Sequence, residues 1–341
     1  MRRFLPGILP TLISYSLFFA ICPAAAQPQS TPASIFTHTV VQPYGGDVSD
    51  EAAYEAAVVL ARHALVDMLS GWLANHSALS LAFAETPPRA VADALIDAKV
   101  TGTEFLTDAS SEAVAVTVTA SFFPSQTVQK AKELLLHNDL LSLHRYALQH
   151  EQNLLDHFVS LTGQRKTPYE ETPKGSAEYS RLVNALRSMQ AYREVLPLLQ
   201  TNGIWQVPET VTERMRAAID LDQRNPLAWN ALGEAHYQLE RTIDAAGEQD
   251  TAIRLNPEFA RAWHARGTAY LKLSLAELAL EDFTRALVLE PEEASYWQAR
   301  GSAYLVLNKF DAMCRDYAKA CSLGNCDSLH WARSRGHCPD Q

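Results

Sequence analysis

The chain has 341 residues, of which 47% are hydrophobic, and its formal net charge at pH 7 is −10. This length suits two domains, and this hydrophobic content supports full cores, so the composition argues against a disordered chain. The net negative charge argues against a nucleic acid or an anionic membrane surface as the main partner.

Residues 1–26 have the organisation of a secretory signal peptide. Two arginines follow the first methionine, a short apolar run comes next, and three alanines ending at Ala26 form a small-residue cleavage site. We expect cleavage after Ala26, which places the mature protein in the periplasm of a Gram-negative bacterium or outside the cell, with no transmembrane segment left. A lipid anchor on Cys22 is the weaker alternative, because Ile21 stands where a lipid-attachment site needs a small residue.

Residues 27–124 are predicted to form a small α+β domain. Small residues and threonines alternate with valines along Glu112–Phe122, the period-two pattern of a strand with one buried face. The predicted elements are a strand at Ile35–Val41, a long alanine-rich helix at Glu51–Asn75, a short helix at Arg89–Ala98 and a hairpin of Lys99–Thr107 with Glu112–Phe122. Their order distantly resembles the small N-terminal domains of secreted assembly proteins such as the flagellar assembly protein T family.

Residues 125–175 are predicted to be a helical linker, with a long helix or a helical pair at Gln126–Leu161 and an exposed loop after it. Four histidines lie on this stretch: His137, His144, His150 and His157. The first two share a helix face but stand about 10 Å apart along it, too far to bind one metal ion together. We therefore expect surface or interface histidines and no metal site.

A pattern returns three times between Asn225 and Ser322. Three tryptophans and three glycines each follow one another at the same constant interval, which we call the repeat period: Trp229, Trp263 and Trp297, and Gly233, Gly267 and Gly301. A fixed period of this length is typical of stacked helical repeats. Each unit is predicted to be two antiparallel helices, near 226–257, 260–291 and 294–322, with the glycine allowing the second helix to approach closely.

The Trp, Gly, Tyr, Ala, Phe and Pro positions within these units resemble the tetratricopeptide repeat. Gln249 departs from the pattern where an aromatic residue is usual, and Met313 departs where a small one is usual. Upstream, the predicted helices Ser176–Thr201 and Pro208–Leu221 form either a degenerate fourth repeat or an ordinary helical hairpin. The expected fold class is thus α+β, with the small N-terminal domain followed by an α-helical solenoid over residues 176–341.

Four cysteines remain after cleavage of the signal peptide, all near the C-terminus. An even, clustered set in an exported protein favours disulfides over a zinc site. A turn at Leu323–Asn325 followed by a final antiparallel helix would bring Cys321 beside Cys326 and Cys314 beside Cys338. The segment Lys319–Cys326 is similar to the helix-turn bridges of cysteine-rich Sel1-like repeats, which favours the same pairs. We expect both bonds to fasten a C-terminal capping helix onto the last repeat.

The resemblance to tetratricopeptide repeats implies a concave groove lined by the first helix of each unit. Repeats that clamp a C-terminal carboxylate place Lys and Asn at several groove positions, and here only Asn230 fits, so that mode is not expected. The implied partner is an extended or helical peptide. The implied groove residues are Asn230, Glu234, Tyr237, His264, Thr268, Leu271, Gln298, Ser302 and Leu305.

No nucleophile elbow, phosphate loop or dinucleotide-binding glycine pattern occurs in the sequence. Asp93 and Asp97 are the acidic residues nearest to a catalytic pair, and their spacing of four on a short helix is better explained by a solvated face. We therefore expect no catalytic residues, no cofactor and no enzymatic activity.

The sequence thus predicts an exported protein-interaction module, acting as an adaptor or assembly factor in the bacterial cell envelope. Its partner would be another periplasmic or envelope protein. Three alternatives stay open: an enzyme or ligand-binding site in the N-terminal α+β domain, a structural envelope protein, and repeats that act only as a spacer. A deep polar pocket in residues 35–124 would favour the first alternative.

Overall fold

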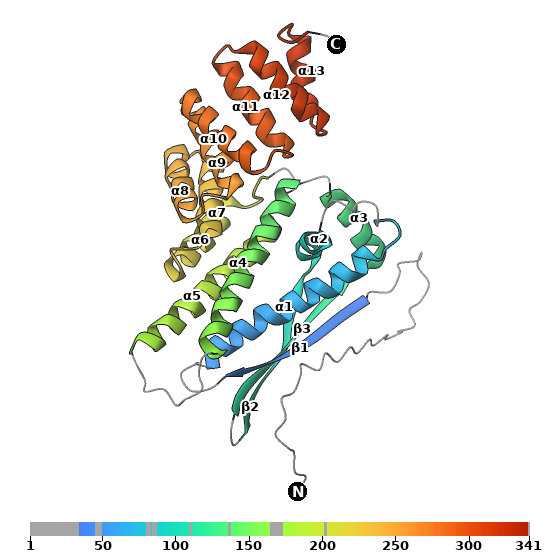
Figure 1. Ribbon diagram of the computed structural model, residues 1–341, viewed down its shortest axis with the longest axis vertical. Helices are drawn as coiled ribbons and strands as arrows, with labels where there is room; N and C mark the ends of the chain where they lie inside the picture. Colours follow the sequence, from blue (N-terminus) through green and yellow to red (C-terminus); the bar gives the residue numbers. More distant parts are fainter. Residues whose placement is uncertain are drawn as a thin grey trace.

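The computed structural model describes residues 34–44, 50–79, 83, 87–108, 111–135, 138–163, 173–200 and 203–339. The predicted signal peptide and His137 lie outside these residues. A three-stranded sheet with helices forms the N-terminal part, and stacked helix pairs follow it (Figure 1). The structure therefore confirms the predicted fold class.

The sheet is antiparallel with strand order β1-β3-β2, formed by β1 (Ser34–Tyr44), β2 (Ala98–Asp108) and β3 (Ser111–Phe122). Along β3, Val114, Val116 and Val118 are buried beneath the helix α1, while the alternate residues, among them Thr117, point to the other face. The predicted alternation therefore gives the sheet one covered face and one open face.

The helix α1 (Asp50–Ala74) lies across the covered face of the sheet, and its small side chains explain the close fit. Ala52, Ala53, Ala56 and Ala57 are all buried there. Among the described residues, α1 is the one helix long and apolar enough to cross a membrane, and half of its most apolar stretch is buried against the rest of the chain.

Four further helices flank α1: α2 (Pro88–Leu95), α3 (Pro124–Leu134), α4 (Asn138–Gly163) and α5 (Pro173–Val195). Thus Gln126–Leu161 forms a helical pair rather than one helix. The helix predicted to reach Ala98 ends at Leu95, because Ala98 already pairs with Ala120 in the sheet. Leu155 and Phe158 of α4 belong to the same core as α1, so α4 packs on the N-terminal part (Figure 1).

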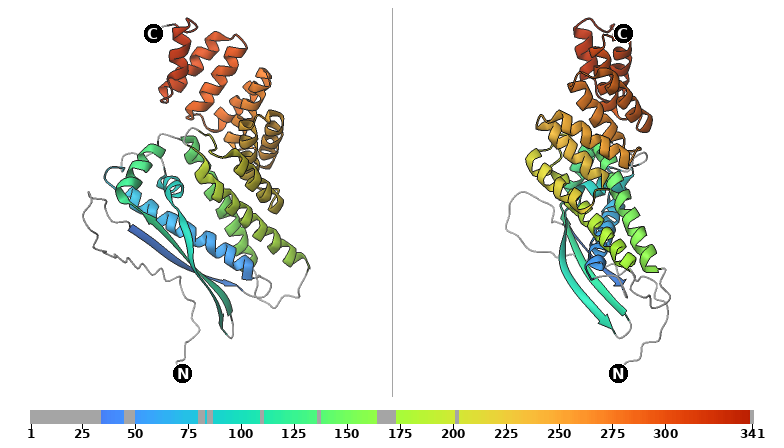
Figure 2. Two further views of the ribbon diagram at one scale, coloured as in Figure 1. Left: turned by 180° about the vertical axis from the view of Figure 1, so that it is seen from behind. Right: turned by 90° about the vertical axis from the view of Figure 1, so that its left-hand side faces the viewer.

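The C-terminal half is a stack of antiparallel helix pairs that extends away from the sheet beyond the ends of α4 and α5 (Figure 2). The pairs turn at residues with positive φ, Glu240, Ser274 and Asn308, which recur at the repeat period. The helices are α6 (Pro208–Leu221), α7 (Pro226–Gln238), α8 (Thr242–Leu255), α9 (Ala260–Lys272), α10 (Ala276–Leu289), α11 (Ala294–Val306), α12 (Phe310–Ser322) and α13 (Asp327–Ser334).

The repeated glycines stand where the two helices of a unit touch. A Cβ at Gly267 would lie 2.7 Å from Cε1 of the fully buried Phe283. We expect Gly267→Ala to lower the free energy of unfolding by about 1–3 kcal/mol, because the ring has no room to retreat. Chemical denaturation measures the change.

A matched control is Gly247→Ala, on the exposed face of α8, where an added Cβ meets nothing within 4 Å. Alanine should stabilise that helix by about 0.5–1 kcal/mol. Equal effects of the two alanines would contradict the close contact at Gly267.

Candidate functional sites in the repeats and in a buried ion cluster

The second and third repeats share an arginine held between two aromatic rings. The guanidinium of Arg266 lies 5.0 Å from the Trp263 ring centre and 5.6 Å from that of Tyr270. It also donates hydrogen bonds of 2.9 and 2.8 Å to the two carboxylate oxygens of Asp282. Arg300 makes the same contacts one repeat later, so these residues are engaged in holding each unit together.

The first repeat replaces this arginine with a leucine. Leu232 and Glu248 stand one repeat period before Arg266 and Asp282, so Glu248 has no arginine at this place. Its carboxylate lies 2.7 Å from Nδ1 of His236 instead. Burial, with Asp244 nearby, raises the pKa of Glu248 to about 7. This unit therefore holds an acid that binds a proton near neutral pH, where an ordinary glutamate does not.

The first third of the predicted groove is used by the chain itself. Asn230 is buried and donates a 2.9 Å hydrogen bond to Gln249, the residue that replaces the usual aromatic. The prediction that Asn230 lines an open groove is therefore wrong. Glu234 accepts hydrogen bonds from Arg261 at 2.6 Å and from the indole of Trp205 at 3.2 Å.

Trp205 belongs to the segment between α5 and α6, and it is held against α7. The side-chain amide of Gln238 accepts from the backbone N–H of Trp205 at 2.9 Å and donates to its carbonyl at 3.2 Å. Tyr237 is half-buried beside this contact, with the ammonium of Lys272 at 4.8 Å from its ring centre. A partner on the first repeat would therefore meet Tyr237 and Lys272 rather than Asn230 or Glu234.

The remaining predicted groove residues lie half-buried on α9 and α11. His264 stacks on Tyr296 with ring centres 4.8 Å apart. Gln298 accepts a 2.6 Å hydrogen bond from Asn325 in the turn after α12. The other members of this set are Thr268, Leu271, Ser302 and Leu305, all half-buried. The second and third repeats thus place polar and aliphatic side chains together on neighbouring first helices.

Two disulfides fasten the last helix to the repeats. Cys314 bonds Cys338 and Cys321 bonds Cys326, with Cα–Cα distances of 5.6 and 4.0 Å. These are the pairs expected from the turn and the final helix. Met313, the large residue where a small one is usual, fills the core between α12 and this helix together with Cys338.

The cap also carries a residue that the sequence analysis missed. Trp331 of α13 stands one repeat period after Trp297, so α13 begins a further unit in the same phase. The cap is therefore a shortened first helix of a repeat. The periodicity of the tryptophans was sufficient to find it.

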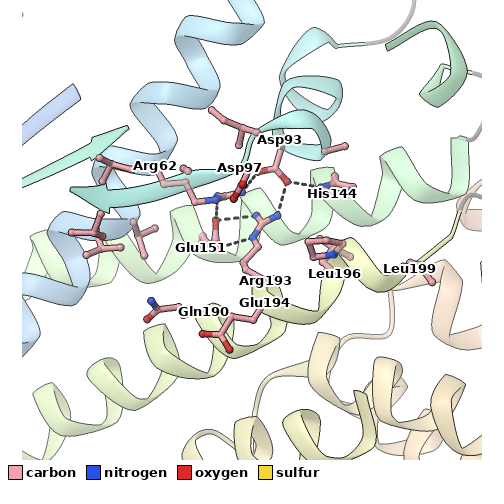
Figure 3. A pocket seen from close by; sticks show the side chains of 18 of the residues that line it. Arg62, Asp93, Asp97, His144, Glu151, Gln190, Arg193, Glu194, Leu196 and Leu199 are labelled. Atoms are coloured by element: carbon pink, nitrogen blue, oxygen red, sulfur yellow. Dashed lines mark hydrogen bonds and ion pairs between the residues drawn. The ribbon is translucent and has the colours of Figure 1, made fainter. Parts of the chain in front are cut away.

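The second candidate site is a buried ion cluster between four helices of the N-terminal part (Figure 3). Asp93 of α2 accepts hydrogen bonds from Arg62 of α1 and, at 2.5 Å, from Nη1 of Arg193 on α5. Glu151 of α4 accepts from Nη1 of Arg62 at 3.0 Å and from Nε and Nη2 of Arg193 at 2.8 and 3.0 Å. Each carboxylate thus meets both guanidinium groups.

Two imidazoles complete the ion cluster. Nδ1 of His144 lies 2.6 Å from Oδ2 of Asp93, and Nε2 of His63 lies 2.9 Å from Oε2 of Glu151. Burial, together with the nearby Arg193 and Arg62, lowers the pKa of His144 despite its hydrogen bond with Asp93. His144 is therefore neutral at pH 7 and adds a hydrogen bond without a charge.

The arginines decide the charge state of the two acids. Burial alone would raise the pKa of Asp93, but Arg193 and Arg62 outweigh it and hold that pKa well below its usual range. The pKa of Glu151 is lowered in the same way. At neutral pH the two carboxylates of the ion cluster are therefore ionised and face the two guanidinium cations.

The ion cluster corrects two sequence-based interpretations. Asp93 was assigned to a solvated face, but it is buried, whereas the side chain of Asp97 is 81% exposed and lies beyond the end of α2. His144 was expected at a surface or interface and is buried among four helices. Of the other histidines, His157 is exposed and His150 is half-buried.

No metal site accompanies these side chains within the described ranges: no group of three or more His, Cys, Asp or Glu residues there could hold a metal ion. Every carboxylate oxygen of the ion cluster already accepts a hydrogen bond from Arg or His. The arrangement therefore suits helix packing and the donation of hydrogen bonds, not metal chemistry.

Comparison with solved structures finds two TPR proteins and MamA among the similar chains. TTC0263, a thermophilic TPR protein of Thermus thermophilus, is 20% identical with a TM-score of 0.37, covering 55% of this chain and 97% of its own. MamA of Desulfovibrio magneticus is 19% identical with a TM-score of 0.38, covering 45% and 85%. The first TPR of Spaghetti (RPAP3), bound to an HSP90 peptide, is 20% identical with a TM-score of 0.31, covering 38% and 94%.

Among curated proteins, none matches the chain significantly. A family model, the tetratricopeptide repeat, matches residues 260–293, which span α9 and α10. The units before and after this match share its phase, and their helices have the same lengths to within one residue. The chain is therefore a protein with tetratricopeptide repeats in its C-terminal half.

Proposed function

We propose that the protein is exported and that its tetratricopeptide repeats bind another periplasmic or envelope protein, as an adaptor or assembly factor. The observation that carries this proposal is the stack of in-phase repeats, because such repeats usually act as non-enzymatic scaffolds for protein partners. The two disulfides support an oxidising compartment such as the periplasm. The signal peptide predicted at residues 1–26 agrees with export.

The proposed binding face is formed by the first helices α9 and α11, with Tyr237 and Lys272 at its edge. Leu271 and Leu305 would supply apolar contact, and Gln298 would supply hydrogen bonds to a peptide backbone. A clamp for a C-terminal carboxylate is not part of the proposal, because Asn230, the residue that fits such a clamp, is buried.

The test is photo-crosslinking in intact cells from a probe at Leu271. We expect one dominant protein adduct, because a peptide in the face would lie against α9. The control probe replaces Ile243, which is 76% exposed on the second helix of the first repeat. The same adducts from both positions, or none from Leu271, would reject this face as the binding site and favour repeats that act as a spacer.

A further inference from the structure

A cavity of about 650 Å³ lies between the sheet, α2 and α5, and the ion cluster forms its floor (Figure 3). This volume is within the range of sites that hold small organic ligands. The sequence predicted no such pocket, because its walls come from strands and helices that are separate in the chain. None of the residues that line the cavity belongs to the proposed binding face of the repeats, so the cavity concerns a different ligand.

The walls of the cavity are mostly apolar. Val100 of β2 is part of these walls: its register partner Val118 is buried on the covered face of the sheet, and Val100, on the same face, remains 41% exposed. The aliphatic side chains of the walls include Val58, Val118, Leu134, Leu140 and Leu196.

Both arginines and both acids of the ion cluster line the cavity, and the arginine side chains are the more exposed. The side chains of Arg62 and Arg193 are 17% and 12% exposed, whereas those of Asp93 and Glu151 are 0% and 3% exposed. The carboxylate oxygens are all occupied by the arginines and histidines. A ligand would therefore have to compete with these bonds for the carboxylate oxygens.

Hydrogen-bond donors, by contrast, remain at the floor. A guanidinium carries five N–H groups, and within the described part of the chain Arg62 donates two of them to the ion cluster and Arg193 donates three. A ligand that reaches the floor would therefore be bound by its own acceptor atoms, and a carboxylate suits paired guanidinium groups best.

The acidic side chains at the rim of the cavity repel an anion only weakly. Its acids are Asp97 and Glu194, and each lies 3.6 Å from a cation, Lys99 and Arg214 respectively. From these observations we propose that the cavity binds a small monocarboxylate with an aliphatic chain. The carboxylate would meet Arg62 and Arg193 at the floor, and the chain would cover Val100 and its neighbours.

The test is isothermal titration of the full mature protein with sodium decanoate, compared with 1-decanol, which has the same chain without the charge. We expect saturable binding of decanoate and at least tenfold weaker binding of decanol. Val100→Trp, which fills the cavity without touching the ion cluster, should weaken decanoate binding at least tenfold. Val41→Trp is the matched control, because Val41 is 55% exposed on the open face of the same sheet and should leave binding unchanged.

Thermal melts establish that each variant is folded, and Gln190→Trp on the α5 wall gives a second block if Val100→Trp does not fold. Absence of saturable decanoate binding to the wild type would overturn the proposal. Equal binding of decanol would overturn the role of the arginines. Unchanged binding by a folded cavity-filling variant would also overturn it, since decanoate would then bind elsewhere. None of these results bears on whether the repeats bind a protein.

Discussion

Replacing Asp93 with alanine is expected to lower the free energy of unfolding by about 3–5 kcal/mol, the usual cost of breaking a buried ion pair. The variant leaves Arg62 and Arg193 with Glu151 as their remaining carboxylate partner, so one positive charge stays buried without balance. His144 loses its hydrogen bond as well. Chemical denaturation followed by far-UV circular dichroism measures the loss.

The neighbouring acid provides the control for this variant. Asp97→Ala removes an exposed carboxylate four positions along the chain and should change the free energy of unfolding by less than about 0.5 kcal/mol. If Asp93→Ala cost no more than Asp97→Ala, the ion cluster would not hold the four helices together.

A fall in pH should also destabilise the fold through the ion cluster. Folding lowers the pKa of Asp93 and of Glu151, so both carboxylates stabilise the fold at pH values above their unfolded pKa of about 4. That stability is lost as the pH falls further toward the folded pKa values. Between about pH 5 and pH 3, the wild type should therefore lose more stability than Asp93→Ala when both are followed by chemical denaturation.

Removing the disulfide between Cys314 and Cys338 is expected to destabilise the cap by about 3 kcal/mol, from the loop entropy of cysteines with a sequence separation of 24. The double variant Cys314→Ala with Cys338→Ala should release α13 from the last repeat, so limited proteolysis should remove the cap first. Met313 would then lose the partners that bury it.

The second disulfide closes a much shorter loop, because the sequence separation of Cys321 and Cys326 is 5. The same relation gives about 2 kcal/mol for its removal. The double variant Cys321→Ala with Cys326→Ala should therefore be destabilised less than the double variant without the first disulfide. Peptide mapping without reduction should recover both bonds in the exported protein. Free thiols, or pairs of another connectivity, would contradict the fastened cap.

The repeats could be predicted from the sequence because their determinants are local and periodic. A glycine such as Gly267 and its ring partner Phe283 lie within one unit, and the same contact recurs in the next unit between Gly301 and Tyr317. The alternation along β3 and the alanines of α1 predicted the sheet and its covering helix for the same reason. In each case a short stretch carries its own pattern.

The ion cluster could not be predicted, because its members are single polar residues on four different helices. Asp93 bonds His144 across 51 positions of sequence and Arg193 across 100. Each residue alone has the appearance of a solvated side chain on its own helix. One clue was present: Arg62 and His63 interrupt an otherwise apolar stretch of α1 between Ala61 and Leu65, where polar residues need buried partners.

The groove was predicted incompletely for a similar reason. The phase of the repeats located its residues, but Trp205 lies outside the period, in the connection before α6. Its indole donates a hydrogen bond to Glu234, which the repeat pattern alone assigns to partner binding. Its backbone bonds Gln238, to which the repeat pattern assigns no role. A periodic sequence predicts the contacts that recur in every repeat. A contact from a segment outside the repeats is found only in the three-dimensional structure.

The last unit is shorter than the repeats before it. α13 has 8 residues where α11 has 13, and Arg335 stands where Gly301 admits the Tyr317 ring. The cap therefore lacks the small residue at which the second helix of each earlier unit approaches the first. The two disulfides instead hold α13 against α12, so the apolar end of the last repeat is kept from solvent by covalent bonds within the chain.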